Sequence, residues 1–524
     1  MITARERLRN GGQIFMSGTV FYALIICAGF GLGLLVRARP RLGVRGARDD
    51  AFYELVLVRA LKKQRRLPVF VDNYMLDTGE QCMPPGFPVL LSLLPKAVAW
   101  RWPWLVNPVL DAGVGAGLGC LLWAHSSSVL QVLCAMLAWA FAPALVRTCS
   151  ALNRRILGNT LLVLCMLLTI QCLLSGGVWP AVAVAVAGAA MFLSHRRSAH
   201  AFVFTVLGLA VWRQSWSPVG LLGLVFGAAL VLSAGFYLKV FRGNIQWLEF
   251  RRRNWKHMGA HMVYGSPAYS RDAAVGAAAA AVRHVALNPV RGLAGGAAQL
   301  LARNYLLPVF LIVAWREFAW WTEFERLLAA WAALTYLWAA LTAFVPQLRF
   351  MGAEVRYEKM AAFPMIYLTV GALGWGAPWW LLPLFAAALA LNARQVARLY
   401  KELSQAPPAE RGLGPVLDAL RQAPEDGVLI LPPHVCDRVV LETGKKVFWG
   451  GHGGGFARLE EFSPVLRRRV EEFFMRYNLS FLLLDTEYMP PESLGLDDWF
   501  DPVISSGHYT LYRYHHGPAP APAE

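Results

Sequence analysis

The sequence has few charged residues. Asp, Glu, Lys and Arg make up 16% of its 524 residues, while hydrophobic residues make up 56%. Soluble domains carry about 25% charged residues, so this composition excludes a soluble fold and predicts an integral membrane protein. The 20 Trp residues suit a chain whose segments end at membrane interfaces.

The cysteines lack any pairing pattern. None of the eight Cys residues belongs to a Cys-x-x-Cys arrangement, and most of them lie inside apolar segments. This distribution argues against a zinc site and against a disulfide framework. A bond between Cys82 and Cys436 stays open, because it would require both residues to face an oxidising compartment.

Acidic residues are outnumbered by basic ones. The chain has 33 Asp and Glu residues against 50 Lys and Arg residues, for a net charge of +17. Such a charge favours contact with membrane lipids or phosphates. Nucleic acid is not an expected partner, because the basic residues lie in short clusters between apolar segments.

Long apolar segments are abundant. About eleven of them have helical length and few charges, which predicts a polytopic α-helical membrane protein. The first segment, 14–36, lacks a small-residue cleavage site, so we expect a retained helix rather than a signal peptide. The others are expected at 105–124, 128–147, 157–175, 177–194, 200–213, 217–240, 304–320, 327–345, 361–376 and 378–393.

The hydrophilic segments suggest a domain organisation. Residues 1–400 are expected to form the multi-pass domain, with two large external loops at 37–103 and 241–303. Residues 408–516 are expected to form a small external α/β domain, and the Pro/Ala-rich residues 517–524 a disordered tail. The expected elements of the α/β domain are strands at 427–431, 480–484 and 508–514, with a helix at 463–477.

The orientation in the membrane is not settled by charge. An odd number of spans puts the two termini on opposite sides, and the basic N-terminus favours a cytoplasmic start. The Arg residues between 37 and 48, which follow the first span, favour the reverse.

An acidic pair follows the first apolar segment. Asp49 and Asp50 precede Ala51-Phe52-Tyr53-Glu54. Carboxylates at the edge of a bilayer act as general bases or metal ligands, although an acidic loop in water has the same appearance. Position alone therefore leaves a catalytic and a solvated role open.

Four features together resemble the GT-C glycosyltransferases, which take sugar from a polyprenyl-phosphate carrier. The acidic pair with Tyr53 resembles the motif of their first external loop. The segment Pro84-Pro85-Gly86-Phe87-Pro88 is similar to the Pro-rich part of that loop. Arg356-Tyr357, followed by Pro364, resembles the pattern that opens a late span. The α/β tail is similar to the domain that ends many bacterial members, such as the aminoarabinose and mannosyl transferase-like group.

The resemblance implies a function and a set of site residues. It implies transfer of a sugar to a glycan or lipid acceptor at the outer face of the bacterial inner membrane, with a periplasmic tail domain. Asp50, or failing that Asp49, is expected to be the catalytic base. Substrate contacts are expected from Tyr53, Arg154, Arg155, Arg356 and Tyr357.

One departure from the family concerns metal binding. Many members carry a second acidic residue in the next external loop, but here that stretch, 148–155, contains none. An acidic pair alone supplies few of the ligands that a divalent metal ion needs. We therefore predict no metal ligands, and dependence on a divalent metal stays open. Arg154 and Arg155 suit a lipid phosphate or, alternatively, an interfacial anchor.

Two other functions are compatible with the sequence. A polymerase or ligase of surface polysaccharide also combines many spans with basic loops, but relies on Arg and His residues in a late loop. A transporter or scaffold would place charged residues inside the spans. Asp111 is the clearest such residue.

Overall fold

The computed structural model describes most of the chain. The described ranges are 4–42, 49–76, 80–126, 128–254, 303–351, 355–374, 377–404, 412–450, 456–461, 463, 466–487, 489–496 and 498–515. Most of the predicted loop 241–303 and the predicted disordered tail 517–524 lie outside these ranges.

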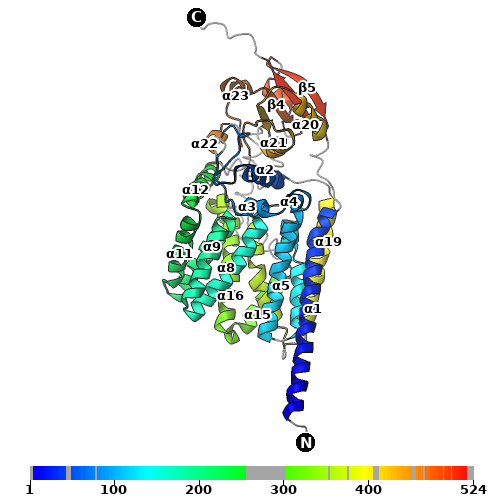
Figure 1. Ribbon diagram of the computed structural model, residues 1–524, viewed down its shortest axis with the longest axis vertical. Coiled ribbons are helices and arrows are strands. Elements are labelled where there is room, and N and C mark those ends of the chain that lie inside the picture. The colour runs from blue at the N-terminus through cyan, green and yellow to red at the C-terminus, as the bar shows by residue number, and fades with distance from the viewer. Residues whose placement is uncertain are drawn as a thin grey trace, which may run out of the picture.

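The apolar segments fold into a bundle of helices, with the C-terminal tail above one end and the N-terminus at the other (Figure 1). Each segment predicted to span the membrane falls on a helix or on a broken pair. The bundle helices are α1 (Ala4–Leu42), α5 (Val106–Ser126), α6 (Val129–Ala140), α7 (Pro143–Cys149), α8 (Arg155–Ser175), α9 (Val178–Phe192), α10 (Arg196–Arg213), α11 (Ser217–Leu232), α15 (Leu306–Glu317), α16 (Glu323–Phe344), α18 (Ala362–Gly371) and α19 (Leu381–Ser404).

Several of these helices have the length and composition of membrane spans. Within the described residues, Val20–Pro40, Pro103–Ser126 and Arg155–Ser175 qualify singly, and two bent helix pairs raise the number to five. One pair is α6 with α7, which bend by 51°. The apolar helices confirm the predicted membrane architecture.

The predicted span 217–240 is wrong at its end. Helix α11 stops at Leu232, and α12 (Phe236–Asn254) leaves it at an angle of 116°. The break lies at Ala234 and Gly235, which both have positive φ angles, of 48° and 81°. An α-helix cannot continue through two left-handed residues, so the apolar pattern runs on while the helix does not.

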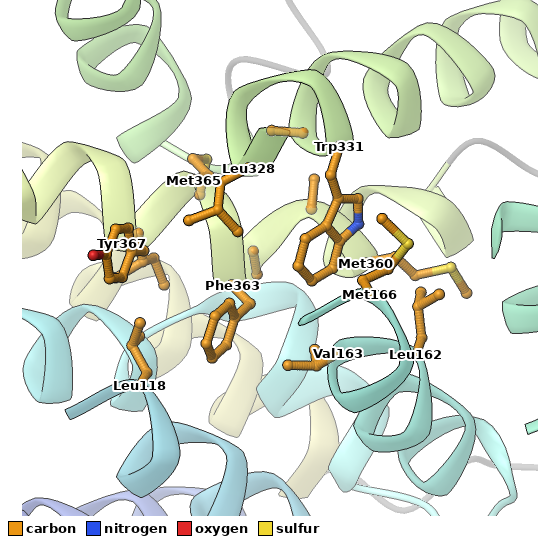
Figure 2. Close-up of a cluster of buried hydrophobic side chains, with 14 of the residues drawn as sticks. Leu118, Leu162, Val163, Met166, Leu328, Trp331, Met360, Phe363, Met365 and Tyr367 are labelled. Atoms are coloured by element: carbon orange, nitrogen blue, oxygen red, sulfur yellow. The ribbon is translucent and has the colours of Figure 1, made fainter. Parts of the chain in front are cut away.

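Aromatic and sulfur-containing side chains fill the centre of the bundle. Figure 2 shows Trp331, Phe363 and Met360 packed together with residues of α8. The rings of Trp331 and Phe363 stack at 6.2 Å between centroids, and Trp139 meets Phe363 edge-on. This core supports the short 3₁₀ helix η4 (Lys359–Ala361), which carries residues of the site described below.

A buried ion pair joins the first two spans. Arg37 and Asp111 form a salt bridge with both side chains almost wholly buried. Arg37 also donates a hydrogen bond of 2.6 Å to the carbonyl of Trp139, whose indole donates to the carbonyl of Asp111 at 2.9 Å. The charge of Asp111, which suggested a transporter, is thus explained by a structural partner.

The most exposed tryptophans lie at the end of the bundle away from the tail. They occupy helix ends and connections there, as expected for an aromatic belt at a membrane interface. These residues, each more than four-fifths exposed, are Trp179, Trp216, Trp315, Trp320 and Trp379.

The tail folds around a four-stranded mixed sheet in the order β3-β4-β6-β5. Strands β3 (Val428–Leu431) and β4 (Phe481–Asp485) are parallel, and β6 (Tyr509–Tyr514) runs antiparallel to both β4 and β5. These three strands match the predicted ones. Strand β5 (Phe500–Ser506) escaped prediction because most of its residues are exposed or half-buried.

Helices cover this sheet. They are α20 (Leu413–Gln422), α21 (Cys436–Thr443), α22 (Phe456–Leu459) and α23 (Val470–Tyr477). Helix α23 begins seven residues after the predicted start at 463, because residues 466–469 are not helical. Cys82 and Cys436 are both free thiols.

The first loop contributes to the tail's hydrophobic core. Helix α2 (Asp49–Gln64) packs Val56 and Leu57 into the same cluster as β3 and α21. The chain after β1 (Val69–Phe70) also pairs with the tail, because the amide of Met75 donates to the carbonyl of Val447 and the amide of Val447 donates to the carbonyl of Asn73. Loop and tail therefore form one packed layer above the bundle (Figure 1).

The apolar segment after the Pro-rich motif is divided into two short helices. It forms α3 (Gly86–Leu93) and α4 (Lys96–Arg101), separated at Pro95. In α3, Phe87 and Leu91 are fully buried, so this helix packs into the protein rather than lying only on the membrane.

We expect Arg37→Met to destabilise the protein by about 3–5 kcal/mol, because Asp111 would remain buried without its counter-ion. Thermal unfolding of the purified protein in detergent measures the effect. The double variant Arg37→Met/Asp111→Leu should be less destabilised than the single one. Arg39→Met, which removes an exposed arginine next to Tyr400, is the matched control, and an equal loss in both single variants would contradict the argument.

Candidate functional site

The acidic pair opens helix α2. Asp49 and Asp50 are its first two residues, and an acidic start is favourable because the helix dipole is positive there. Their side chains lie outside what the structure describes, so the catalytic assignment stays a prediction. The helix itself places them one turn before Tyr53 and Glu54, both of which are buried.

A buried arginine connects three segments beside α2. Arg154, the residue before α8, donates from Nε to Glu54 Oε1 at 2.7 Å and from Nη1 to the carbonyl of Pro84 at 3.1 Å. Its guanidinium lies 5.3 Å from the centroid of the Tyr53 ring. The Tyr53 hydroxyl in turn donates to Gln81 at 3.1 Å. Arg154 and Tyr53, predicted separately, are therefore in contact.

The Pro-rich motif packs against the connection between α9 and α10. The amide of Gly86 donates to the carbonyl of Leu193 at 2.7 Å. A Cβ atom at Gly86 would lie 2.3 Å from the Ser194 hydroxyl and 3.0 Å from the Leu193 carbonyl. Only glycine allows this close approach, so the motif needs its third residue as well as its prolines.

Four cations surround the imidazole of His195. Burial, together with the charges of Lys359, Arg197, Arg155 and Arg154, holds the pKa of His195 well below its usual value. The ring is therefore neutral at pH 7. Its Nδ1 accepts a hydrogen bond of 3.2 Å from the amide of Ser198 at the start of α10, which makes His195 a helix cap rather than a base.

The late motif enters the same region from α17 (Val355–Glu358). Tyr357 is fully buried and donates to the carbonyl of Met351 at 3.2 Å. Lys359 is buried and donates to the Thr148 hydroxyl at 3.2 Å. The side chain of Arg356 lies outside what the structure describes, so its role stays a prediction.

The indole of Trp247, on helix α12 (Phe236–Asn254), contacts two arginines, Arg196 of α10 and Arg251 of α12. The guanidinium of Arg196 lies 3.6 Å from the centroid of the Trp247 ring, and that of Arg251 lies 4.8 Å from it. Trp247 is buried and both arginines are half-buried. Arg251 is also within electrostatic range of Tyr357. Its Nε is buried without a hydrogen-bond partner among the described residues.

An apolar cavity of about 730 Å³ lies between α10, α15 and α16. Its wall includes Trp212, Leu307, Phe310 and Tyr336. Along α16 it extends from Arg326 to Ala340, which corresponds to about 21 Å of helix. Tyr336 interacts electrostatically with the buried Glu358, so the cavity reaches the polar site.

The described residues contain no group of three or more His, Cys, Asp or Glu side chains that could hold a metal ion. Of the two carboxylates described in the site, Glu54 pairs with Arg154 at 2.7 Å, and Glu358 is buried. Metal dependence stays open.

Several site residues escaped the sequence argument. Glu54, His195, Lys359 and Trp247 carried no motif signal, and only the tertiary fold brings them together. Arg251 belongs to the basic run Arg251-Arg252-Arg253 in the last turn of α12. For Glu54, the available signal was its position as a charged residue directly after the motif that ends at Tyr53.

Solved structures share this architecture. The archaeal oligosaccharyltransferase AglB from Archaeoglobus fulgidus, in complex with an inhibitory peptide and a dolichol-phosphate, matches over 95% of this chain and 74% of its own, with a TM-score of 0.55 and 12% identity. ArnT from Cupriavidus metallidurans, bound to undecaprenyl phosphate, matches over 94% of this chain and 97% of its own, with a TM-score of 0.55 and 10% identity. Both proteins belong to the GT-C superfamily.

The chain has the GT-C fold. No protein-family model and no curated protein matches the sequence, so the likeness is one of structure. The shared fold confirms the predicted architecture of apolar helices with a small C-terminal mixed-sheet domain. At this identity the likeness establishes the fold, and the roles of the site residues stay predictions.

We expect Glu54 and Arg154 to be energetically coupled by about 1–3 kcal/mol, because replacing either residue alone would leave the charge of the other buried without its partner. A double-mutant cycle with Glu54→Gln and Arg154→Gln, followed by thermal unfolding, measures this coupling. The exposed pair Arg147–Glu402, at 3.2 Å, is the control and should couple by less than about 1 kcal/mol. Equal coupling in both cycles would refute the importance of burial.

Proposed function

We propose that this protein is an integral membrane glycosyltransferase that moves a sugar from a polyprenyl-phosphate carrier to a glycan or lipid acceptor. The observation that carries the proposal is the arrangement of the site. A helix that starts with two aspartates, a cluster of cations and a long apolar cavity meet at the tail-facing end of a GT-C bundle. An acid, a phosphate site and a lipid site are the three parts that this reaction needs.

The cations supply the phosphate site. Arg251 and Arg196 are stacked on Trp247, which pre-orients two planar guanidinium groups. Two like charges at one indole are stabilised when an anion lies between or beside them. The buried Nε of Arg251 provides a donor for a phosphate oxygen, and Arg155 and the predicted Arg356 extend the positive region.

The apolar cavity supplies the site for the carrier's chain. Its lining is almost entirely hydrocarbon, and its length along α16 is comparable to most of a bilayer's apolar thickness of about 30 Å. A polyprenyl chain in the cavity would have its phosphate near Glu358 and Lys359.

The acidic pair supplies the base. An acceptor hydroxyl attacks the anomeric carbon, a new carbon–oxygen bond forms, and the bond from that carbon to the phosphate oxygen breaks. The hydroxyl proton passes to the carboxylate of Asp50 or Asp49. The departing phosphate keeps the bonding electrons, and its negative charge is stabilised by the arginines.

The cellular setting belongs to the proposal as well. The protein is a membrane protein by its apolar helices and its fold. We place it in the bacterial inner membrane with the N-terminus in the cytoplasm and the tail in the periplasm. This orientation rests on the tail and N-terminus lying at opposite ends of the bundle (Figure 1) and on the GT-C resemblance.

Replacing the base should lower turnover far more than carrier binding. We expect Asp50→Asn, or Asp49→Asn if that residue is the base, to reduce kcat by about 10²–10⁴, because the amide cannot accept the proton. Transfer from a radiolabelled polyprenyl-phosphate sugar in proteoliposomes measures it. Asp72→Asn, in an exposed position of the same loop, should keep wild-type kcat. Wild-type turnover in both the Asp49 and the Asp50 variant would contradict the assignment of the catalytic base.

Replacing the guanidinium group of Arg251 with an ammonium group should weaken carrier binding. Arg251→Lys keeps the charge but loses the planar donor pair and the stacking on Trp247, so we expect KM for the carrier to rise about 10–100-fold. The neighbouring Arg252→Lys, at an exposed position of the same helix, should leave KM unchanged. The same KM in both variants would show that the phosphate binds elsewhere.

A further inference from the structure

One face of helix α12 packs against the rest of the protein. Its buried residues recur at intervals of three or four and include Val240, Asn244, Trp247 and Phe250. Towards its end, Phe250 contacts the ring of Phe456 in the tail at 5.6 Å. This inner face connects bundle, proposed phosphate site and tail.

The opposite face begins as an apolar surface. Leu238, Phe241 and Ile245 recur at helical spacing and are 43%, 41% and 41% exposed. Val231 and Leu232, at the end of α11, are also exposed, at 79% and 62%. An exposed apolar surface of this kind is stable when hydrocarbon covers it.

The same face then becomes polar along the helix. Beyond Ile245 the exposed positions are Gln246, Glu249, Arg252 and Arg253. The helix rises by about 12 Å from Ile245 to Arg253. A head-group layer is about 5–8 Å thick, so an inclined helix of this pattern passes from the hydrocarbon through the head groups into water.

Two basic residues lie among the apolar positions, just before this transition. Lys239 and Arg242 are exposed among the apolar residues, and long basic side chains at that depth extend towards lipid phosphates. We infer that the face of α12 formed by Leu238, Lys239, Phe241, Arg242 and Ile245 binds anionic phospholipids of the leaflet next to the tail. Charge complementarity and the apolar-to-basic order along the helix identify a lipid surface as its occupant.

This surface is independent of the proposed reaction. Lipid binds to the outer face of α12, whereas Trp247 and Arg251 lie on the inner side. The lipid contact holds α12 at a fixed depth. The test therefore measures bound lipid and not sugar transfer, so its failure would leave the proposed function untouched.

The experiment uses the full chain in nanodiscs made of phosphatidylcholine and phosphatidylglycerol. Native mass spectrometry after gentle release counts the lipids that stay bound. We expect the wild-type protein to retain phosphatidylglycerol over phosphatidylcholine. Arg242→Gln should reduce this preference about fivefold, the factor expected for one basic side chain near an anionic surface. Phe241→Gln/Ile245→Gln should release both lipids more readily.

Arg252→Gln is the matched control, because it removes an exposed arginine from the polar end of the same helix. It should retain phosphatidylglycerol as the wild type does. Equal retention of the two lipids by the wild type, or equal loss in the Arg242 and Arg252 variants, would overturn the inference. A dimer mass that disappears in the Phe241→Gln/Ile245→Gln variant would also overturn it, by showing that a second copy covers this face.

Discussion

Arg154 donates hydrogen bonds to Glu54 and to the Pro84 carbonyl, and so holds helix α2, the Pro-rich segment and the start of α8 in one place. A buried ion pair of this kind adds little net stability, because desolvation opposes the attraction between its charges. It does restrict geometry, since a shifted helix would leave a buried charge unpaired. The position of the acidic pair at the start of α2 depends on this constraint.

The surroundings of that ion pair explain why the site suits an anion. Arg155, Arg197 and Lys359 add positive charge around His195, which is itself kept neutral. A region with more buried cations than carboxylates is stabilised by a negatively charged ligand. The same electrostatic imbalance that makes the unliganded site costly makes it suitable for a phosphate.

The tail is joined to the site through its hydrophobic core. Val56 and Leu57 of α2 pack with strand β3 and helix α21, and the Tyr74 hydroxyl donates to Asp437 at 2.5 Å. Helix α12 reaches the tail from the other side, where Arg253 pairs with Glu460 at 3.0 Å. Movement of the tail would therefore displace α2, which carries the acidic pair, and α12, which carries Arg251. These contacts couple the position of the tail to the positions of both helices.

Composition and periodicity by themselves determined the class of the protein, the approximate helices and the inner strands of the tail. These features depend on local hydrophobicity, which the chain displays directly. The resemblance to a known family also predicted Tyr53 and Arg154 as substrate contacts, although it did not predict that they contact each other. Only the tertiary structure decided that Glu54 neutralises Arg154, that Trp247 carries two arginines and that the segment 217–240 breaks at Gly235. Those outcomes depend on contacts between residues far apart in the chain, or on single backbone angles, and neither leaves a periodic signal in the sequence.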